Sequence, residues 1–220
     1  MKKSIQPEKL SAMKKILFAI AIAWAAMTGA MAQETAVGIT AGIGHSWLSD
    51  QAGKTLGHPA WNVGGSFIYS TARHWGFGFD IKYSREGRTT RYAPDDHVER
   101  ANLDYIRVPL RVTYFFNELD KDVRLKVSLA PTLGFLAGAR YKIKNAEGDE
   151  VVNNSFKDEV NGFDFGLTFG AGVNFRVSER AWLTTELAYY NGFTNVAKDG
   201  GTTLNRNVAF NAGVMFGIGK

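Results

Sequence analysis

The residues best suited to catalysis are histidines with polar neighbours. His45 is followed directly by Ser46, and His97 comes directly after Asp95 and Asp96. A histidine next to a hydroxyl or a carboxylate can act as a general base in the cleavage of lipids or peptides. Aspartates in polar loops are more commonly only solvated. We therefore expect no enzyme, no cofactor and no metal site, with a hydrolase at the rim of the fold as the less favoured alternative.

Composition and charge exclude several classes of protein. The chain has no cysteine, which excludes disulfides, thiolate metal sites and a lipid-modified N-terminal cysteine. The first 32 residues contain five lysines and one glutamate, so they account for +4 of the net charge of +5 and leave +1 for the rest. A chain with so little excess positive charge has no patch suited to nucleic acid. We expect no nucleic-acid partner.

Residues 1–32 have the order of a secretory signal peptide. Lys14 and Lys15 precede an apolar run over residues 16–26, and Ala30-Met31-Ala32 forms a small-residue cleavage site. The apolar run is too short to cross a hydrocarbon core of roughly 30 Å as a helix. We expect a cleaved signal peptide over residues 1–32, with Met13 as an alternative start, and one domain over residues 33–220.

The rest of the chain alternates between apolar and polar residues, which is the pattern of strands with two different faces. Residues 75–84 are the clearest case. One face carries Trp75, Phe77, Phe79, Ile81 and Tyr83, and the other carries Gly76, Gly78, Asp80, Lys82 and Ser84. The same pattern predicts strands over residues 35–48, 60–71, 74–85, 103–116, 122–138, 162–177, 181–193 and 206–219. Pro109 and Pro131 fall inside two of them, where we expect a bulge or bend because proline removes a ladder donor.

The connections between these strands alternate in length. Residues 71–73, 117–121 and 178–180 are short, whereas residues 49–59, 86–102, 139–161 and 192–205 form long loops. Short periplasmic turns and long outer loops are typical of outer-membrane barrels. The predicted fold is all-β: an eight-stranded antiparallel up-and-down transmembrane β-barrel in the bacterial outer membrane. A soluble lipocalin-like barrel is the alternative.

Aromatic residues gather near both ends of the predicted strands, where amphipathic rings favour the membrane interface. On the short-turn side these are Tyr69, Trp75, Tyr114, Phe116, Phe175 and Phe216. On the long-loop side they are Trp47, Trp61, Tyr83, Tyr141, Phe163 and Tyr189. The sequence therefore predicts two aromatic belts with an apolar, lipid-facing band between them.

The polar face of the strands carries charges that would point into the lumen. These are Asp80, Lys82, Arg107, Arg111, Arg124, Lys126, Asp164, Arg176 and Glu186. An eight-stranded barrel has an interior that side chains can fill, and unpaired charges there are costly. We expect a charge network that closes the lumen. A narrow passive channel is the alternative, and it would prefer anions because basic residues outnumber acidic ones.

The segment LDYIRVPLRVTYFF over residues 103–116, together with the signal and the alternating strands, resembles the PorT-like outer-membrane β-barrel proteins of Gram-negative bacteria. The resemblance covers residues 37–218 and implies the fold and the location. Asn211, Gly213, Phe216 and Ile218 are similar to the C-terminal signal that the barrel-assembly machinery reads. The chain departs from that signal because it ends in Gly219-Lys220 without a terminal aromatic residue.

The long loops are the best surface for a partner, since binding residues commonly lie on loops held by a rigid scaffold. Arg85, Arg88, Arg91 and Arg100 lie in or near the second long loop, where guanidinium groups suit the phosphates of lipopolysaccharide. We expect an outer-membrane protein with a structural or surface-interaction role. Its expected partners are outer-membrane lipid including lipopolysaccharide, the barrel-assembly machinery and an unknown surface ligand.

Overall fold

The computed structural model describes residues 34–49, 54–71, 74–92, 97–118, 120–145 and 148–218. The expected signal peptide lies outside the described residues, as do Asp95, Asp96, Gly219 and Lys220. Within these ranges, no helix is both long and apolar enough to cross a membrane.

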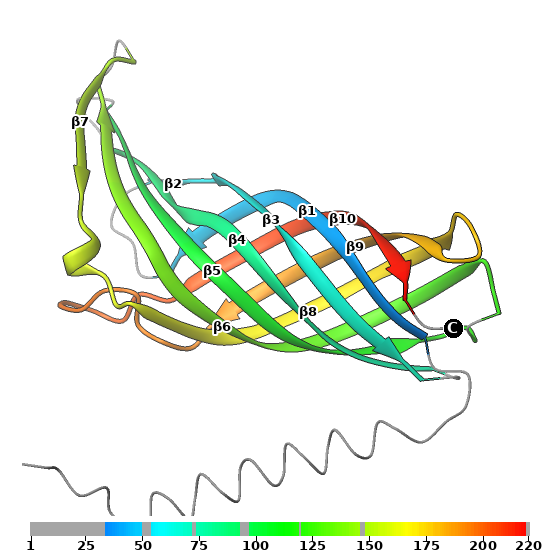
Figure 1. Ribbon diagram of the computed structural model, residues 1–220. Helices are drawn as coiled ribbons and strands as arrows, with labels where there is room; N and C mark the ends of the chain where they lie inside the picture. Colours follow the sequence, from blue (N-terminus) through cyan, green and yellow to red (C-terminus); the bar gives the residue numbers. More distant parts are fainter. Residues whose placement is uncertain are drawn as a thin grey trace, which may run out of the picture. The chain divides into compact units, whose positions relative to one another are not determined.

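Eight long antiparallel strands form a closed barrel, in which each strand pairs with the next along the chain and the first pairs with the last (Figure 1). They are β1 (Glu34–Leu48), β3 (His58–Ser70), β4 (Trp75–Tyr92), β5 (His97–Phe115), β6 (Val123–Lys144), β8 (Phe163–Arg176), β9 (Ala181–Gly192) and β10 (Asn205–Gly217). Three short elements accompany them: β2 (Lys54–Leu56), β7 (Glu150–Ser155) and the 3-10 helix η1 (Lys157–Glu159). The prediction of an eight-stranded antiparallel barrel is confirmed.

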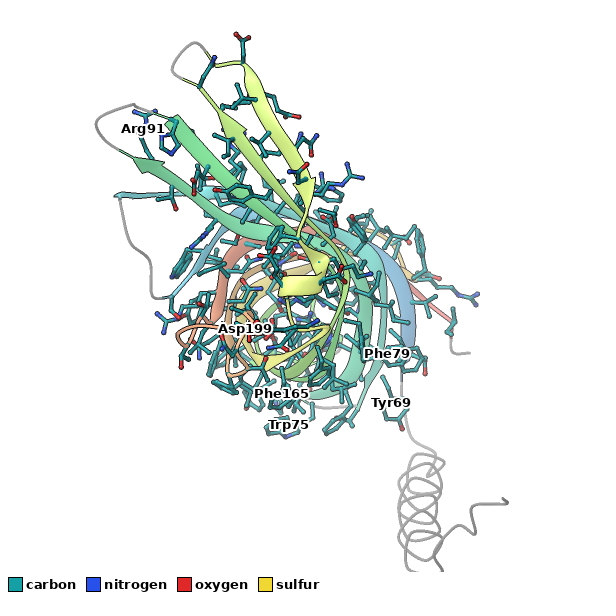
Figure 2. The ribbon with its side chains drawn as sticks, turned by 90° about the vertical axis from the view of Figure 1, so that its left-hand side faces the viewer. Tyr69, Trp75, Phe79, Arg91, Phe165 and Asp199 are labelled. Carbon is teal, nitrogen blue, oxygen red and sulfur yellow. The ribbon has the colours of Figure 1, made fainter. Side chains whose placement is uncertain are left out.

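Apolar side chains cover the outside of the barrel and polar ones fill the inside. Ile39 and Ile43 are 70% and 73% exposed, whereas Asp80 on the inner face is only 2% exposed. Figure 2 shows Phe79 and Phe165 on the outside of the barrel. This is the reverse of a soluble barrel, and it suits a protein whose exterior meets hydrocarbon.

Aromatic pairs lie at both ends of the apolar band. At the short-turn end, the rings of Trp75 and Tyr114 are 5.0 Å apart, and at the long-loop end those of Trp61 and Tyr83 are 5.6 Å apart. Tyr141 is an exception to the predicted belts. It lies farther out on β6 and packs against Phe156 instead, because β6 continues beyond the belt.

Two of the expected long loops are largely strand, and the loop prediction was wrong for them. β4 and β5 stay paired from Glu86↔Leu103 as far as Tyr92↔His97, and β6 continues to Lys144 and pairs with β7. Residues 86–92 and 97–100 are mostly polar on both faces and lack the alternation that marks the membrane strands, whereas residues 139–144 alternate but carry a basic residue at every second position, on the outer face. Figure 2, which views the long-loop end, shows the β4–β5 and β6–β7 hairpins projecting beyond the outline of the barrel.

Of the expected bulge or bend, no bulge forms at either proline. The register between β5 and β6 is the same on both sides of the prolines, at Pro109↔Thr132 and at Val112↔Leu129. Pairing between β5 and β6 is interrupted between these two points, where Pro131 supplies no donor, and pairing between β4 and β5 is interrupted at Asp80 and Ile81, beside Pro109. The register shift lies instead between Asp104 and Tyr105, toward the long-loop end.

Candidate functional site

A buried arginine joins two carboxylates near the long-loop end of the lumen. Arg107, on β5, contacts Glu86 with a separation of 2.6 Å between Nη2 and Oε2, and contacts Asp164 with 2.7 Å between Nη1 and Oδ2. Its guanidinium lies between the rings of Tyr105 and Tyr190, at 4.3 and 4.4 Å from their centroids. Because Arg107 is only 5% exposed, these contacts replace its hydration.

Further hydrogen bonds hold the two carboxylates in place. The Tyr190 hydroxyl donates to Asp164 Oδ2 at 2.9 Å, and the Thr194 hydroxyl donates to Asp164 Oδ1 at 2.6 Å. Asn205 Nδ2 donates to Glu86 Oε2 at 2.5 Å. We call Glu86, Arg107, Asp164, Tyr190 and Asn205 the outer cluster. Its members come from β4, β5, β8, β9 and β10, so it links five of the eight barrel strands.

A second cluster lies closer to the short-turn end. Arg111 contacts Asp80 Oδ2 at 2.5 Å through Nη2 and Glu186 Oε1 at 2.6 Å through Nη1. Lys82 Nζ lies 3.2 Å from Asp80, and Lys126 Nζ lies 3.9 Å from Glu186. We call these five residues the inner cluster. Three cations face two anions there, and every member has a partner of opposite charge.

Seven of the nine expected lumen charges lie in these two clusters, and two arginines do not. Arg124 stacks on Phe115 at 3.8 Å and donates to the Asn117 carbonyl. Arg176 stacks on Trp182 at 4.8 Å. Both lie toward the short-turn end of their strands, where aromatic side chains turn inward.

The sequence reasoning missed Glu86, which was assigned to the second long loop. The signal was present, because Glu86 continues the inward alternation of Asp80, Lys82 and Ser84 along β4. Tyr105 was missed for a related reason. It has the same phase as Arg107 on β5, and it is fully buried although most aromatic residues of this barrel face outward.

Little empty space remains between the clusters. Two voids of about 50 and 70 Å³ are each lined by Lys82, Arg111 and Glu186. Polar voids of this size hold a few water molecules. These two voids between the clusters therefore have the size of water rather than of a larger solute.

A much larger cavity opens at the long-loop end, with a volume of about 760 Å³. Its apolar lining comes from Leu48, Leu103, Phe156, Val160 and Val196, and its polar and charged lining includes Arg88, Glu159 and Asp199. The bridge between Val160 and Ala197 joins the two loops that border it. A cavity of this size and mixed lining matches small-molecule sites in general.

The histidines that were weighed for catalysis have other neighbours. Ser46 donates to the Gly87 carbonyl and accepts from the Gly87 N–H, so its hydroxyl is engaged with the backbone of β4. His97 Nε2 lies 3.6 Å from Glu99. Among the described residues, no three histidine, aspartate or glutamate side chains gather as ligands for a metal ion.

His58 is buried and precedes Trp61 in β3, beyond the long-loop aromatic belt and therefore outside the expected membrane-spanning part of that strand. Its Nδ1 lies 2.9 Å from Thr89 Oγ1. Burial lowers the pKa of His58 from 6.5 to about 4, and nearby Arg100 adds to the effect. Neutral His58 therefore stabilises the fold fully above about pH 6.5, and this contribution is lost as the pH falls toward 4.

We expect His58→Gln to make the barrel less sensitive to acid. Between pH 7 and pH 4.5, the free energy of unfolding in detergent should fall by about 2 kcal/mol less in this variant than in the wild type. The wild type, measured under the same conditions, is the reference. Equal pH dependence in the two proteins would contradict a buried neutral His58.

The four residues of the expected assembly signal lie in or just after β10. Asn211 points into the lumen, whereas Phe216 and Ile218 are 53% and 61% exposed on the outside. Gly213 pairs with Thr40 of β1 at the seam where the barrel closes. Recognition of these residues by the assembly machinery stays a prediction.

Residues 31–198 match the family model described as an outer membrane protein β-barrel domain. OprG from Pseudomonas aeruginosa is similar in structure, with 14% identity, coverage of 87% of this chain and 99% of OprG, and a TM-score of 0.54. Neisserial surface protein A is 15% identical, with coverage of 83% of this chain and 96% of that protein, and a TM-score of 0.48. Outer membrane protein W of E. coli is 12% identical, with coverage of 86% of this chain and 100% of that protein, and a TM-score of 0.48. No curated protein matches the chain in sequence.

Proposed function

Because the chain belongs to the family of outer membrane proteins with a β-barrel domain and lies in the bacterial outer membrane, we propose that it is a closed barrel that binds a ligand at its outer end. The ligand is a small molecule with an apolar body, held in the cavity at the long-loop end. The contrast between this cavity of about 760 Å³ and the two voids of about 50 and 70 Å³ in the lumen carries the proposal.

The charge clusters favour a binding role over a channel. A solute that crossed the lumen would have to separate Arg107 from Glu86 and Asp164, and then Arg111 from Asp80 and Glu186. Breaking a buried ion pair of this kind costs several kcal/mol unless the solute replaces each contact. We therefore place the passive channel second and a rim enzyme third.

The cavity has the features of a ligand site. Leu103 and Val160 are almost fully buried beneath it and belong to one hydrophobic cluster, so its floor is apolar. Arg88, Glu159 and Asp199 supply charged groups at its wall. Apolar contact area with a few polar groups is the usual combination for affinity and orientation.

We also infer that the chain belongs to the PorT-like barrels within this family. The support is the segment over residues 103–116, which resembles theirs. In this barrel the tyrosine and arginine of that segment have a defined task, since Tyr105 packs on the guanidinium of Arg107 in the outer cluster.

Binding of three probes that share an apolar body would test the proposed function. Indole, tryptamine and indole-3-acetate, added to the protein in lipid nanodiscs, should shift the NMR signals of cavity residues such as Val160 and Val196. Ala101→Trp should abolish these shifts, because Ala101 lines the cavity and an indole side chain would occupy it. The charge preference among the three probes would show which wall group orients the ligand.

Asn102→Trp is the matched control, since its side chain lies on the opposite face of the same strand and should leave the shifts intact. Shifts that persist in Ala101→Trp, or that are absent from the wild type, would contradict a ligand in this cavity. Stepwise conductance of the wild-type protein in planar lipid bilayers would replace the proposal with the channel.

A further inference from the structure

The outward face of the two projecting hairpins carries a group of basic side chains. Ala101 and Leu103 of β5, and Tyr141 of β6, line the cavity on the inner face. Because side chains alternate along a strand, the residues between them lie on the opposite face. That face carries Arg100, Arg140, Lys142 and Lys144, which we call the basic outer face.

The strand register places these residues on successive rungs of the sheet. Arg140 pairs with Asn102, Arg100 pairs with Lys142, and Lys144 pairs with Val98. Arg100 and Lys142 therefore lie directly opposite each other. Like charges in that position destabilise a sheet unless an anion lies between or over them.

Few acidic residues balance this face. Glu150 on β7 is hydrogen-bonded to Lys142 at 2.7 Å, and Lys142 holds the pKa of the Glu150 carboxyl below its usual value. In the part of the chain that the structure describes, no ion pair involves Arg100, Arg140 or Lys144. Of the four cations that define the basic outer face, Lys142 is paired with Glu150, and Arg100, Arg140 and Lys144 are left for an external partner.

The position of the basic outer face points to the membrane surface. It continues the lipid-facing side of the barrel beyond the belt, where Tyr83 pairs with Ile106. The first basic rung, where Arg140 pairs with Asn102, lies four residues beyond Ile106 along β5. For a tilted strand this corresponds to about 10 Å along the barrel axis. Figure 2 shows the hairpins, with Arg91 near the end of one, projecting beyond the outline of the barrel. Their outward face therefore overhangs the lipid around the barrel.

We propose that the basic outer face binds the phosphate groups of lipopolysaccharide in the surrounding outer leaflet. Guanidinium groups bind phosphate oxygens in a bidentate manner, which suits the phosphates of lipopolysaccharide. The bound phosphate supplies a counter-ion to Arg100, whose opposite neighbour Lys142 is already paired with Glu150. Arg88 takes no part, because it lines the cavity on the inner face. This contact orients the hairpins over the lipid and is independent of the ligand in the cavity.

Binding of purified lipopolysaccharide to the protein in detergent micelles tests the proposal. The variant Arg100→Gln/Arg140→Gln/Lys144→Gln should bind at least tenfold more weakly than the wild type, and the affinity of the wild type should fall with added salt. Dephosphorylated lipopolysaccharide should bind the wild type as weakly as intact lipopolysaccharide binds the triple variant. Inorganic phosphate at millimolar concentration should not compete, because the lipid presents several phosphates at once.

The control variant Lys121→Gln/Arg180→Gln/Lys198→Gln loses the same charge elsewhere and should bind like the wild type. Ala101→Trp should also bind lipopolysaccharide normally, which separates this proposal from the one on the cavity. A heat-dependent shift on detergent gels would show that each variant is folded. Equal binding by the triple variant and the wild type, or by intact and dephosphorylated lipopolysaccharide, would overturn the proposal.

Discussion

Replacing Arg107 with alanine is expected to lower the free energy of unfolding by about 3–5 kcal/mol, because Glu86 and Asp164 would remain buried without a counter-ion. Both carboxylates are at most 3% exposed and cannot recover water without opening the lumen. The two tyrosine rings that hold the guanidinium would also lose their contact. Urea unfolding of the barrel in detergent or lipid, followed by tryptophan fluorescence, measures this change.

Arg180→Ala is the control, since Arg180 is exposed in the turn between β8 and β9 and its loss should change stability by less than about 0.5 kcal/mol. The variant Arg107→Met/Glu86→Gln/Asp164→Asn should regain part of the loss, because no net charge is then buried in the outer cluster. Equal stability of Arg107→Ala and the wild type would mean that water already screens the outer cluster. No recovery in the triple variant would assign the loss to packing of the arginine.

Gly64→Val is expected to prevent formation of the barrel. A Cβ atom at Gly64 would lie 2.1 Å from the Ile81 carbonyl oxygen and 2.6 Å from the Cα atom of Lys82, both on the neighbouring strand β4. Backbone atoms in a closed barrel cannot move away without breaking the ladder between β3 and β4. To measure this, the variant is refolded from urea and run on a detergent gel with and without heating. Its migration should not depend on heating.

Gly65→Val provides a matched comparison at the adjacent position. There a Cβ atom points outward, and its nearest neighbour is the Gly38 carbonyl oxygen at 3.9 Å. This variant should fold and migrate like the wild type, because valine suits a lipid-facing strand position. Similar behaviour of the two variants would show that the close approach of β3 and β4 at Gly64 does not limit folding.

The sequence alone predicts whether most strand residues face the lumen or the lipid. Side chains alternate along a strand, so the side of one residue fixes the side of every other. Phe79 and Asp80 illustrate this, since their difference in polarity predicts their difference in exposure. The same rule is weaker beyond the membrane, where both faces of a strand are polar. That is why residues 86–102 were expected to be a loop and Glu86 was missed.

The sequence by itself determined the class of fold, the order of the strands and the apolar exterior, because these depend on local periodicity and on short turns. Only the tertiary structure decided which charges meet. Arg107 and Tyr190 are 83 residues apart in the chain, and the stagger of the strands around the closed barrel brings them together. The cavity and the basic outer face depend on the same stagger, since residues from several hairpins form each of them.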